Sequence, residues 1–199
     1  MRSFIAALVA FAGMAASHAQ APDDVVALAD GCMGCHGIAG YRNAYPSYRV
    51  PKLGGQHADY IVISLKAYRE GMRHHPTMQA QAADLSDEEM AELAAYLVSM
   101  ESEPESGIRN GGDPAAGAVK AETCTACHGE TGVSLQAMWP NLAGQHEDYI
   151  AETLRQYKRG ERQDPVMAGL VMALTEEDIK DLAAFYAAQP GLHTIEYDN

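Results

Sequence analysis

A short motif, Cys-x-x-Cys-His, occurs twice in this chain of 199 residues. It spans residues 32–36 and 124–128, a separation of 92 residues. Beyond the motifs the register settles at 89, so the block Pro51–Ile61 matches the block Pro140–Ile150. Two copies of this length are too few and too long for a solenoid. The duplication therefore predicts two tandem globular domains, each built around the same kind of site.

Cys-x-x-Cys-His is the attachment signature of c-type haem. We expect Cys32 and Cys35 to bind one haem, and Cys124 and Cys127 to bind a second. A thioredoxin-like pair would need a strand–helix context that is absent here. A single zinc site of four cysteines would leave both motif histidines unexplained.

The histidines of the two motifs, His36 and His128, are the expected axial ligands on one face of each iron. Such a ligand needs an acceptor for its other ring nitrogen. A proline carbonyl shortly after the motif would serve, and Pro51 and Pro140 head the best-matched block.

The duplication also selects the sixth iron ligand. Under the offset of 89, Met78 aligns with Met167, and no other methionine pair aligns. Each follows a proline closely, Pro76 or Pro165. Methionine is commonly a filler of apolar cores, but a symmetric pair favours ligation, which gives a closed, higher-potential centre.

The alternative pair of ligands is His57 and His146, which also align. Bis-histidine ligation would lower the potential, but both residues stand at expected helix starts, where helix-end hydrogen bonding also suits them. His74, His75 and His193 have no counterparts in the other copy and are expected at the surface.

Several basic residues are candidates for pairing with haem propionates, although solvated helix ends explain them nearly as well. They are Arg69, Arg73, Lys158, Arg159 and Arg162.

Each copy is expected to be all-α: a small helical fold around one covalently bound haem. Helical periodicity extends over residues 23–31 and 59–71, with Gly71 as a stop. Ser86–Glu89 is a capping-box pattern ahead of a further apolar helix, and Thr175–Asp178 stands at the equivalent place in the second copy. No segment alternates like a strand.

Residues 1–19 are predicted to be a signal peptide that is cleaved near Ala19, since a charged start and a short apolar run precede small residues. The alternative is a retained membrane anchor. We then expect domain 1 over 22–103, a polar linker over 104–111 and domain 2 over 112–199. The net charge of −13 argues against nucleic acid as a partner.

This succession of motifs resembles cytochrome c4, a family of tandem class I c-type cytochromes. In each copy Cys-x-x-Cys-His is followed by Pro-x-Leu-x-Gly-Gln, a helix with Tyr and Gly, and then the methionine. The resemblance covers nearly the whole chain after residue 19.

The resemblance implies a periplasmic electron carrier, rather than an enzyme, between a quinol-oxidising complex (quinol–cytochrome c reductase) and a terminal oxidase, sometimes loosely associated with the membrane. It also implies Met78 and Met167 as ligands and supports the role of Pro51 and Pro140.

Two departures leave alternatives open. The first copy lacks the lead-in found at Gly112–Gly117 and carries a tyrosine-rich loop, Tyr41–Arg49, that the second copy lacks. The chain could instead be the haem subunit of a catalytic complex, such as a flavoprotein sulfide dehydrogenase, or a di-haem peroxidase.

Overall fold

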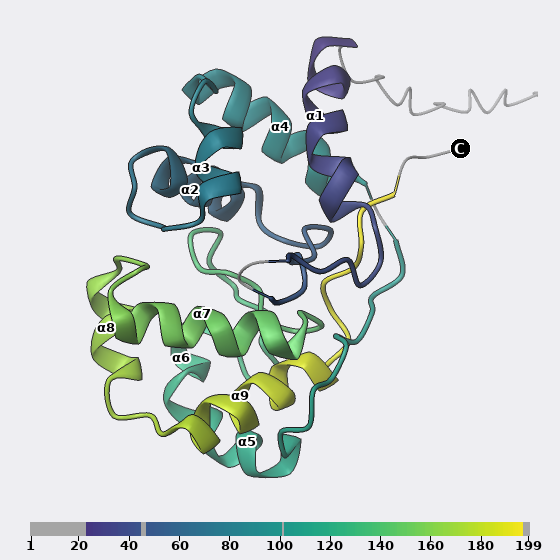
Figure 1. Ribbon diagram of the computed structural model, residues 1–199. Helices are drawn as coiled ribbons and strands as arrows, with labels where there is room; N and C mark the ends of the chain where they lie inside the picture. The colour runs from purple at the N-terminus through teal and green to yellow at the C-terminus, as the bar shows by residue number, and fades with distance from the viewer. Residues whose placement is uncertain (1–22, 45–46, 101, 197–199) are drawn as a thin grey trace, which may run out of the picture.

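The computed structural model describes residues 23–44, 47–100 and 102–196 (Figure 1). The expected signal peptide lies outside these residues. The described part is helical, with only isolated β-bridges besides. Its elements, in order, are α1 (Asp23–His36), α2 (Ala58–Arg69), α3 (Pro76–Ala82), α4 (Asp87–Ser99), α5 (Pro114–Lys120), the 3-10 turn η1 (Ala121–Thr123), α6 (Thr125–His128), α7 (Glu147–Arg159), α8 (Pro165–Val171) and α9 (Glu176–Ala188).

In the first domain, α4 packs against both α1 and α2. The expected apolar face of α2 is buried through Ile61, Leu65 and Tyr68. The capping box is present: Glu89 N donates to Ser86 Oγ at 3.1 Å, and Ser86 N donates to Glu89 Oε2 at 2.8 Å. This box starts α4 where the sequence predicts it.

In the second domain, α9 packs against α5 and α7. Its capping box is also present, with Asp178 N donating to Thr175 Oγ1 at 3.1 Å. The first helix differs between the copies. In domain 1 it extends beyond the expected residues 23–31 to His36, whereas in domain 2 three short pieces, α5, η1 and α6, cover the same stretch. Asp113 caps α5 by accepting from Ala115 N.

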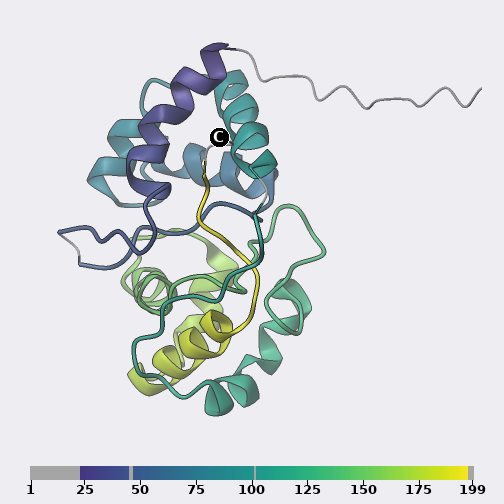
Figure 2. The same cartoon turned by 90° about the vertical axis from the view of Figure 1, so that its right-hand side faces the viewer.

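The C-terminal segment leaves domain 2 and crosses to domain 1 (Figures 1 and 2). His193 and Gly54 exchange two main-chain hydrogen bonds, of 3.0 and 3.1 Å. A Cβ at Gly54 would lie 2.3 Å from the His193 ring, so only glycine allows this approach. Ile195 is fully buried in the core of domain 1.

The linker also has fixed neighbours. Gly107 N donates to Ala187 O, and Gly191 N donates to Glu105 O, so the linker and the C-terminal segment run side by side between the domains (Figure 2). The domain boundaries stay a prediction; the structure adds that the last described residues pack on the other domain.

The domains face each other with approximate two-fold symmetry. His74 N donates to Glu161 O at 2.8 Å, and Gln163 N donates to Met72 O at 2.8 Å. Under the offset of 89 these two bonds exchange places. The same register that relates the two sequences therefore relates the two sides of the interface.

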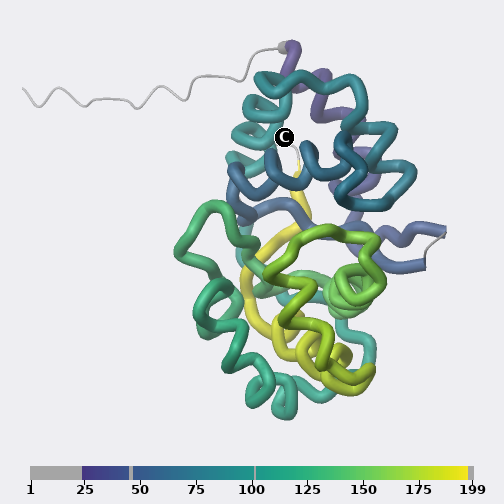
Figure 3. Tube along the Cα trace, turned by 90° about the vertical axis from the view of Figure 1, so that its left-hand side faces the viewer, coloured from purple at the N-terminus to yellow at the C-terminus, as the bar shows by residue number. Residues whose placement is uncertain are grey.

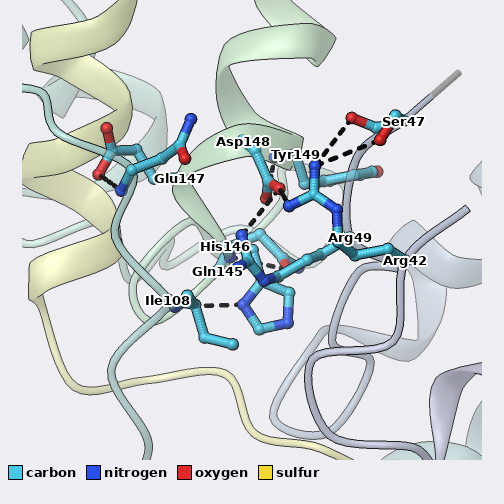
Figure 4. A network of polar contacts seen from close by, with 10 residues as sticks. Arg42, Ser47, Arg49, Ile108, Gln145, His146, Glu147, Asp148 and Tyr149 are labelled. Atoms are coloured by element: carbon cyan, nitrogen blue, oxygen red, sulfur yellow. Dashed lines mark hydrogen bonds and ion pairs between the residues drawn. The ribbon is translucent and has the colours of Figure 1, made fainter.

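The loop of domain 1 that has no counterpart breaks this symmetry (Figure 3). Its arginines, Arg42 and Arg49, both donate to Asp148 Oδ2, at 2.9 and 2.8 Å (Figure 4). Tyr48 is buried and its ring lies 5.9 Å from that of Tyr149. We call the group Arg42, Arg49 and Asp148 the arginine clamp. It fastens the domain 1 loop to the beginning of α7.

Candidate haem sites

The motif cysteines and histidine share one helical face in each domain. Cys32, Cys35 and His36 lie in the last turns of α1. Residues three and four apart on an α-helix are neighbours on its surface. Cys127 and His128 occupy the equivalent places in α6, with Cys124 at its N-terminal cap.

Both motif histidines are held by the expected proline carbonyls. His36 Nδ1 donates to Pro51 O at 2.7 Å, and His128 Nδ1 donates to Pro140 O at 3.0 Å. This bond fixes the tautomer whose Nε2 lone pair is available to a metal. Burial lowers the pKa of both imidazoles, which favours the neutral form that ligation requires.

The paired methionines lie near the start of two short helices that the sequence did not predict. Met78 is in the first turn of α3 and Met167 in the first turn of α8, each behind a proline at the helix start. Met78 N donates to His75 Nδ1 at 3.3 Å, and Met167 N donates to Asp164 Oδ1 at 2.8 Å. The cap therefore fixes the main chain of each methionine, with a different residue in each domain.

One continuous cavity of about 590 Å³ contains both sites. Its walls are mainly apolar, with contributions from α2, α4, α7 and α9. All ten residues predicted for the sites line this cavity: Cys32, Cys35, His36, Pro51, Met78, Cys124, Cys127, His128, Pro140 and Met167.

Two buried cations in this cavity test whether it suits haem. Arg73 is 7% and Arg162 3% exposed. Among the described residues neither forms an ion pair; Arg73 donates to Tyr60 OH at 2.7 Å and Arg162 to Tyr149 OH at 3.1 Å. Buried charges need a partner of opposite sign. The propionates of a bound haem would supply such a partner, so the residues present fit the group.

The other basic candidates bind elsewhere. Arg69 pairs with Asp87 at 2.6 Å, and Arg159 pairs with Glu161 at 2.7 Å. Lys158 donates to the carbonyl of Leu174. These three are thus engaged within their own domains.

The expectation that His75 and His193 lie at the surface is wrong, because both are buried. His75 caps α3, and His193 Nε2 donates to Met100 O at 3.0 Å. Neither histidine has a counterpart in the other copy, so the sequence pattern suggests no role for it. His74 is exposed, as expected.

The alternative ligands His57 and His146 also contact other groups. Both are N-caps, but neither side chain caps its helix. His57 Nε2 donates to Ser134 O at 3.1 Å, whereas His146 Nδ1 accepts from Ile108 N at 3.2 Å (Figure 4). His57 therefore links the two domains, and His146 links domain 2 to the linker.

Two attachment motifs, two histidines held by proline carbonyls and a shared apolar cavity define a di-haem c-type cytochrome. Among the described helices, none is both long and apolar enough to cross a membrane. The chain belongs to the cytochrome c family: the model of that family, described as "Cytochrome c", matches residues 24–101 and again 114–187. It carries two covalently bound haem c groups and is an electron carrier of the cytochrome c4 type.

Three known proteins illustrate the relationship. The chain is 49% identical to cytochrome c4 of Thiocapsa roseopersicina over 80 residues, which are 40% of this chain and 41% of that relative. It is 33% identical to a "Thiosulfate dehydrogenase electron acceptor" of Stutzerimonas stutzeri (strain A1501), over 78% of this chain and 77% of the relative. The solved cytochrome c4 of Acidithiobacillus ferrooxidans matches with a TM-score of 0.69 and 30% identity, over 80% of this chain and 98% of that one.

Proposed function

We propose that the chain carries single electrons in the periplasm from a quinol-oxidising complex to a terminal oxidase. The observation that carries this proposal is the repeated site, in which a histidine backed by a proline carbonyl shares a cavity with one duplicated methionine. Bound haem iron supplies the one-electron redox chemistry.

The protein's own residues then have distinct roles. His36 and Met78 would ligate the iron of haem 1, the haem attached to Cys32 and Cys35. His128 and Met167 would ligate that of haem 2. Methionine at the sixth position raises the potential and leaves no open position for a substrate, which favours a carrier over a peroxidase.

A second candidate differs only in the electron donor. A relative named as the electron acceptor of thiosulfate dehydrogenase matches over most of both chains. The alternative is therefore that this chain takes its electrons from such an enzyme and serves as its haem partner. The His/Met sites would be the same in both cases.

The ligands are tested by a redox titration with spectra on the haem-containing protein. Met78→Ala should lose the methionine–iron absorption band at one haem, lower one potential and allow carbon monoxide to bind one ferrous iron. Met167→Ala should do the same at the other haem. Met72→Ala, at an exposed methionine without a counterpart, should change neither. Carbon monoxide binding at both irons of the wild type would contradict the proposal.

The donor is tested separately by the rate of reduction. One assay supplies quinol and a membrane quinol–cytochrome c reductase, and the other supplies thiosulfate and its dehydrogenase. Fast reduction only by the second system would replace the respiratory proposal with the alternative.

A further inference from the structure

Two equivalent glutamines, Gln56 and Gln145, reach across the domain interface. Gln145 Oε1 accepts from Lys52 N and its Nε2 donates to Lys52 O, both at 3.0 Å. Gln56 Oε1 accepts from Asn141 N at 2.9 Å and its Nε2 donates to Asn141 O at 3.0 Å. Lys52 and Asn141 are themselves equivalent under the offset of 89. The glutamine of each domain thus forms hydrogen bonds to the main chain of the equivalent residue in the other domain.

The peptide groups that these glutamines bind are the same ones that accept hydrogen bonds from the motif histidines. The N–H of Lys52 and the C=O of Pro51 belong to one planar peptide unit. That carbonyl accepts from His36 Nδ1. A hydrogen-bonded chain therefore runs from Gln145 of domain 2, through one peptide group, to the imidazole in domain 1.

The second half of the interface repeats this chain in the opposite direction. Gln56 accepts from Asn141 N, and the carbonyl of the same peptide unit, Pro140 O, accepts from His128 Nδ1. The two hydrogen-bonded chains are therefore reciprocal: each begins at a glutamine of one domain and ends at the motif histidine of the other.

Neither glutamine is free to move. The Oε1 of Gln145 also accepts from His146 N at 3.0 Å, and that of Gln56 accepts from His57 N at 3.0 Å. Both oxygen lone pairs are thus used. Gln145 is 4% exposed, while Gln56 is half-buried. Figure 4 shows Gln145 just before α7, next to His146.

We infer that each glutamine tunes the haem of the opposite domain. Hydrogen bonds in series polarise one another. An acceptor on the N–H makes the carbonyl of the same peptide a stronger acceptor, and a stronger acceptor on Nδ1 makes the histidine a more basic ligand. A more basic ligand stabilises ferric iron. Gln145 therefore lowers the potential of haem 1, and Gln56 lowers that of haem 2.

This inference rests on the proposed ligation by His36 and His128. It assigns Gln56 and Gln145 as positioning residues, which act on the iron only through the peptide and the imidazole. The chain to haem 1 is the more deeply buried one, so it should be the stronger.

The test is a crossed pair of substitutions in the full haem-containing chain, with haem-resolved NMR during a redox titration. Gln145→Met should raise the potential of haem 1 and leave haem 2 unchanged, and the Nδ1 proton of His36 should exchange faster. Gln56→Met should do the reverse, with a smaller shift. Gln189→Met is the matched control. Within the described part of the chain, the hydrogen bond of the Gln189 side chain goes to Phe185 O of α9, so this variant should move neither potential.

The crossed design separates tuning from simple loosening of the interface. Loosening would shift both haems together in either variant, and that result would overturn the inference, as would a shift confined to the haem of the mutated domain. If Gln145→Met does not fold, Gln56→Met on the less buried side still decides the matter. A wild-type spectrum without histidine ligation would instead overturn the proposed function itself.

Discussion

The arginine clamp makes a quantitative prediction about how the two domains hold together. Asp148→Asn removes the negative charge that Arg42 and Arg49 share while keeping the shape of the side chain. The side chain of Asp148 is 8% exposed, that of Arg49 16% and that of Arg42 43%. Arg49 is thus nearly buried, whereas Arg42 remains largely in water.

The expected cost follows from these exposures. Removing one partner of a buried charge pair costs about 3–5 kcal/mol, while an exposed pair contributes only about 0–1 kcal/mol. Asparagine keeps an oxygen that can accept from Tyr149 N, the present partner of Asp148 Oδ1 at 3.0 Å. We therefore expect a loss of about 3 kcal/mol, mostly through Arg49.

The assay is urea unfolding of the haem-containing protein, because a guanidinium salt would screen the charges. The single tryptophan, Trp139, reports on domain 2 and far-UV circular dichroism reports on the whole chain. A double-mutant cycle should give a coupling of about 2 kcal/mol between Asp148→Asn and Arg49→Met. The cycle with Arg42→Met should give less than about 1 kcal/mol.

The duplication supplies a matched control. Asp59 is the counterpart of Asp148, is exposed, and takes part in none of the ion pairs found among the described residues. Asp59→Asn should change the free energy of unfolding by about 0.5 kcal/mol or less. If Asp148→Asn costs no more than this control, the clamp does not hold the domains together.

Two further predictions concern buried side chains. Ile195→Ala should destabilise domain 1 by about 2–4 kcal/mol, because Ile195 is fully buried in that core; unfolding curves should show no such loss for the 94% exposed Leu135→Ala, and an unchanged domain 1 transition would disprove the packing role. His146 has its pKa lowered to about 4 by burial, so the unfolded chain binds the extra proton between about pH 6.5 and pH 4. The wild type should therefore lose about 2 kcal/mol from this group between pH 7.5 and pH 5. His146→Gln should remove that part of the pH dependence of urea unfolding, and the exposed His74→Gln should not; equal pH profiles for wild type and His146→Gln would refute the assignment.

The parts of the structure set by local chemistry were predictable from the sequence. Both capping boxes start their helices, and the proline carbonyls accept from His36 and His128. These features depend on residues close together in the chain, so spacing and side-chain type determine them. The role of the methionines as ligands stays a prediction.

The contacts between domains were not predictable in the same way. The register of 89 shows which residues are equivalent, but it does not show which faces meet. Gln56 and Gln145 are identical in both copies, and that identity was the only signal of a shared role. The burial of His75 and His193 depends on long-range packing that no local pattern encodes. The tyrosine-rich loop is visible in the sequence as a difference between the copies, but its partner Asp148 lies about a hundred residues away.

The position of Ile195 has a consequence for biosynthesis. A chain is made from its N-terminus, so α1–α4 emerge while the residue that completes their core has yet to be translated. Domain 1 is synthesised first and finished last. A product that stops before Ile195 leaves an open core around the first attachment motif, where proteases act on exposed apolar segments. The core of domain 1 thus depends on a segment that is translated only after domain 2.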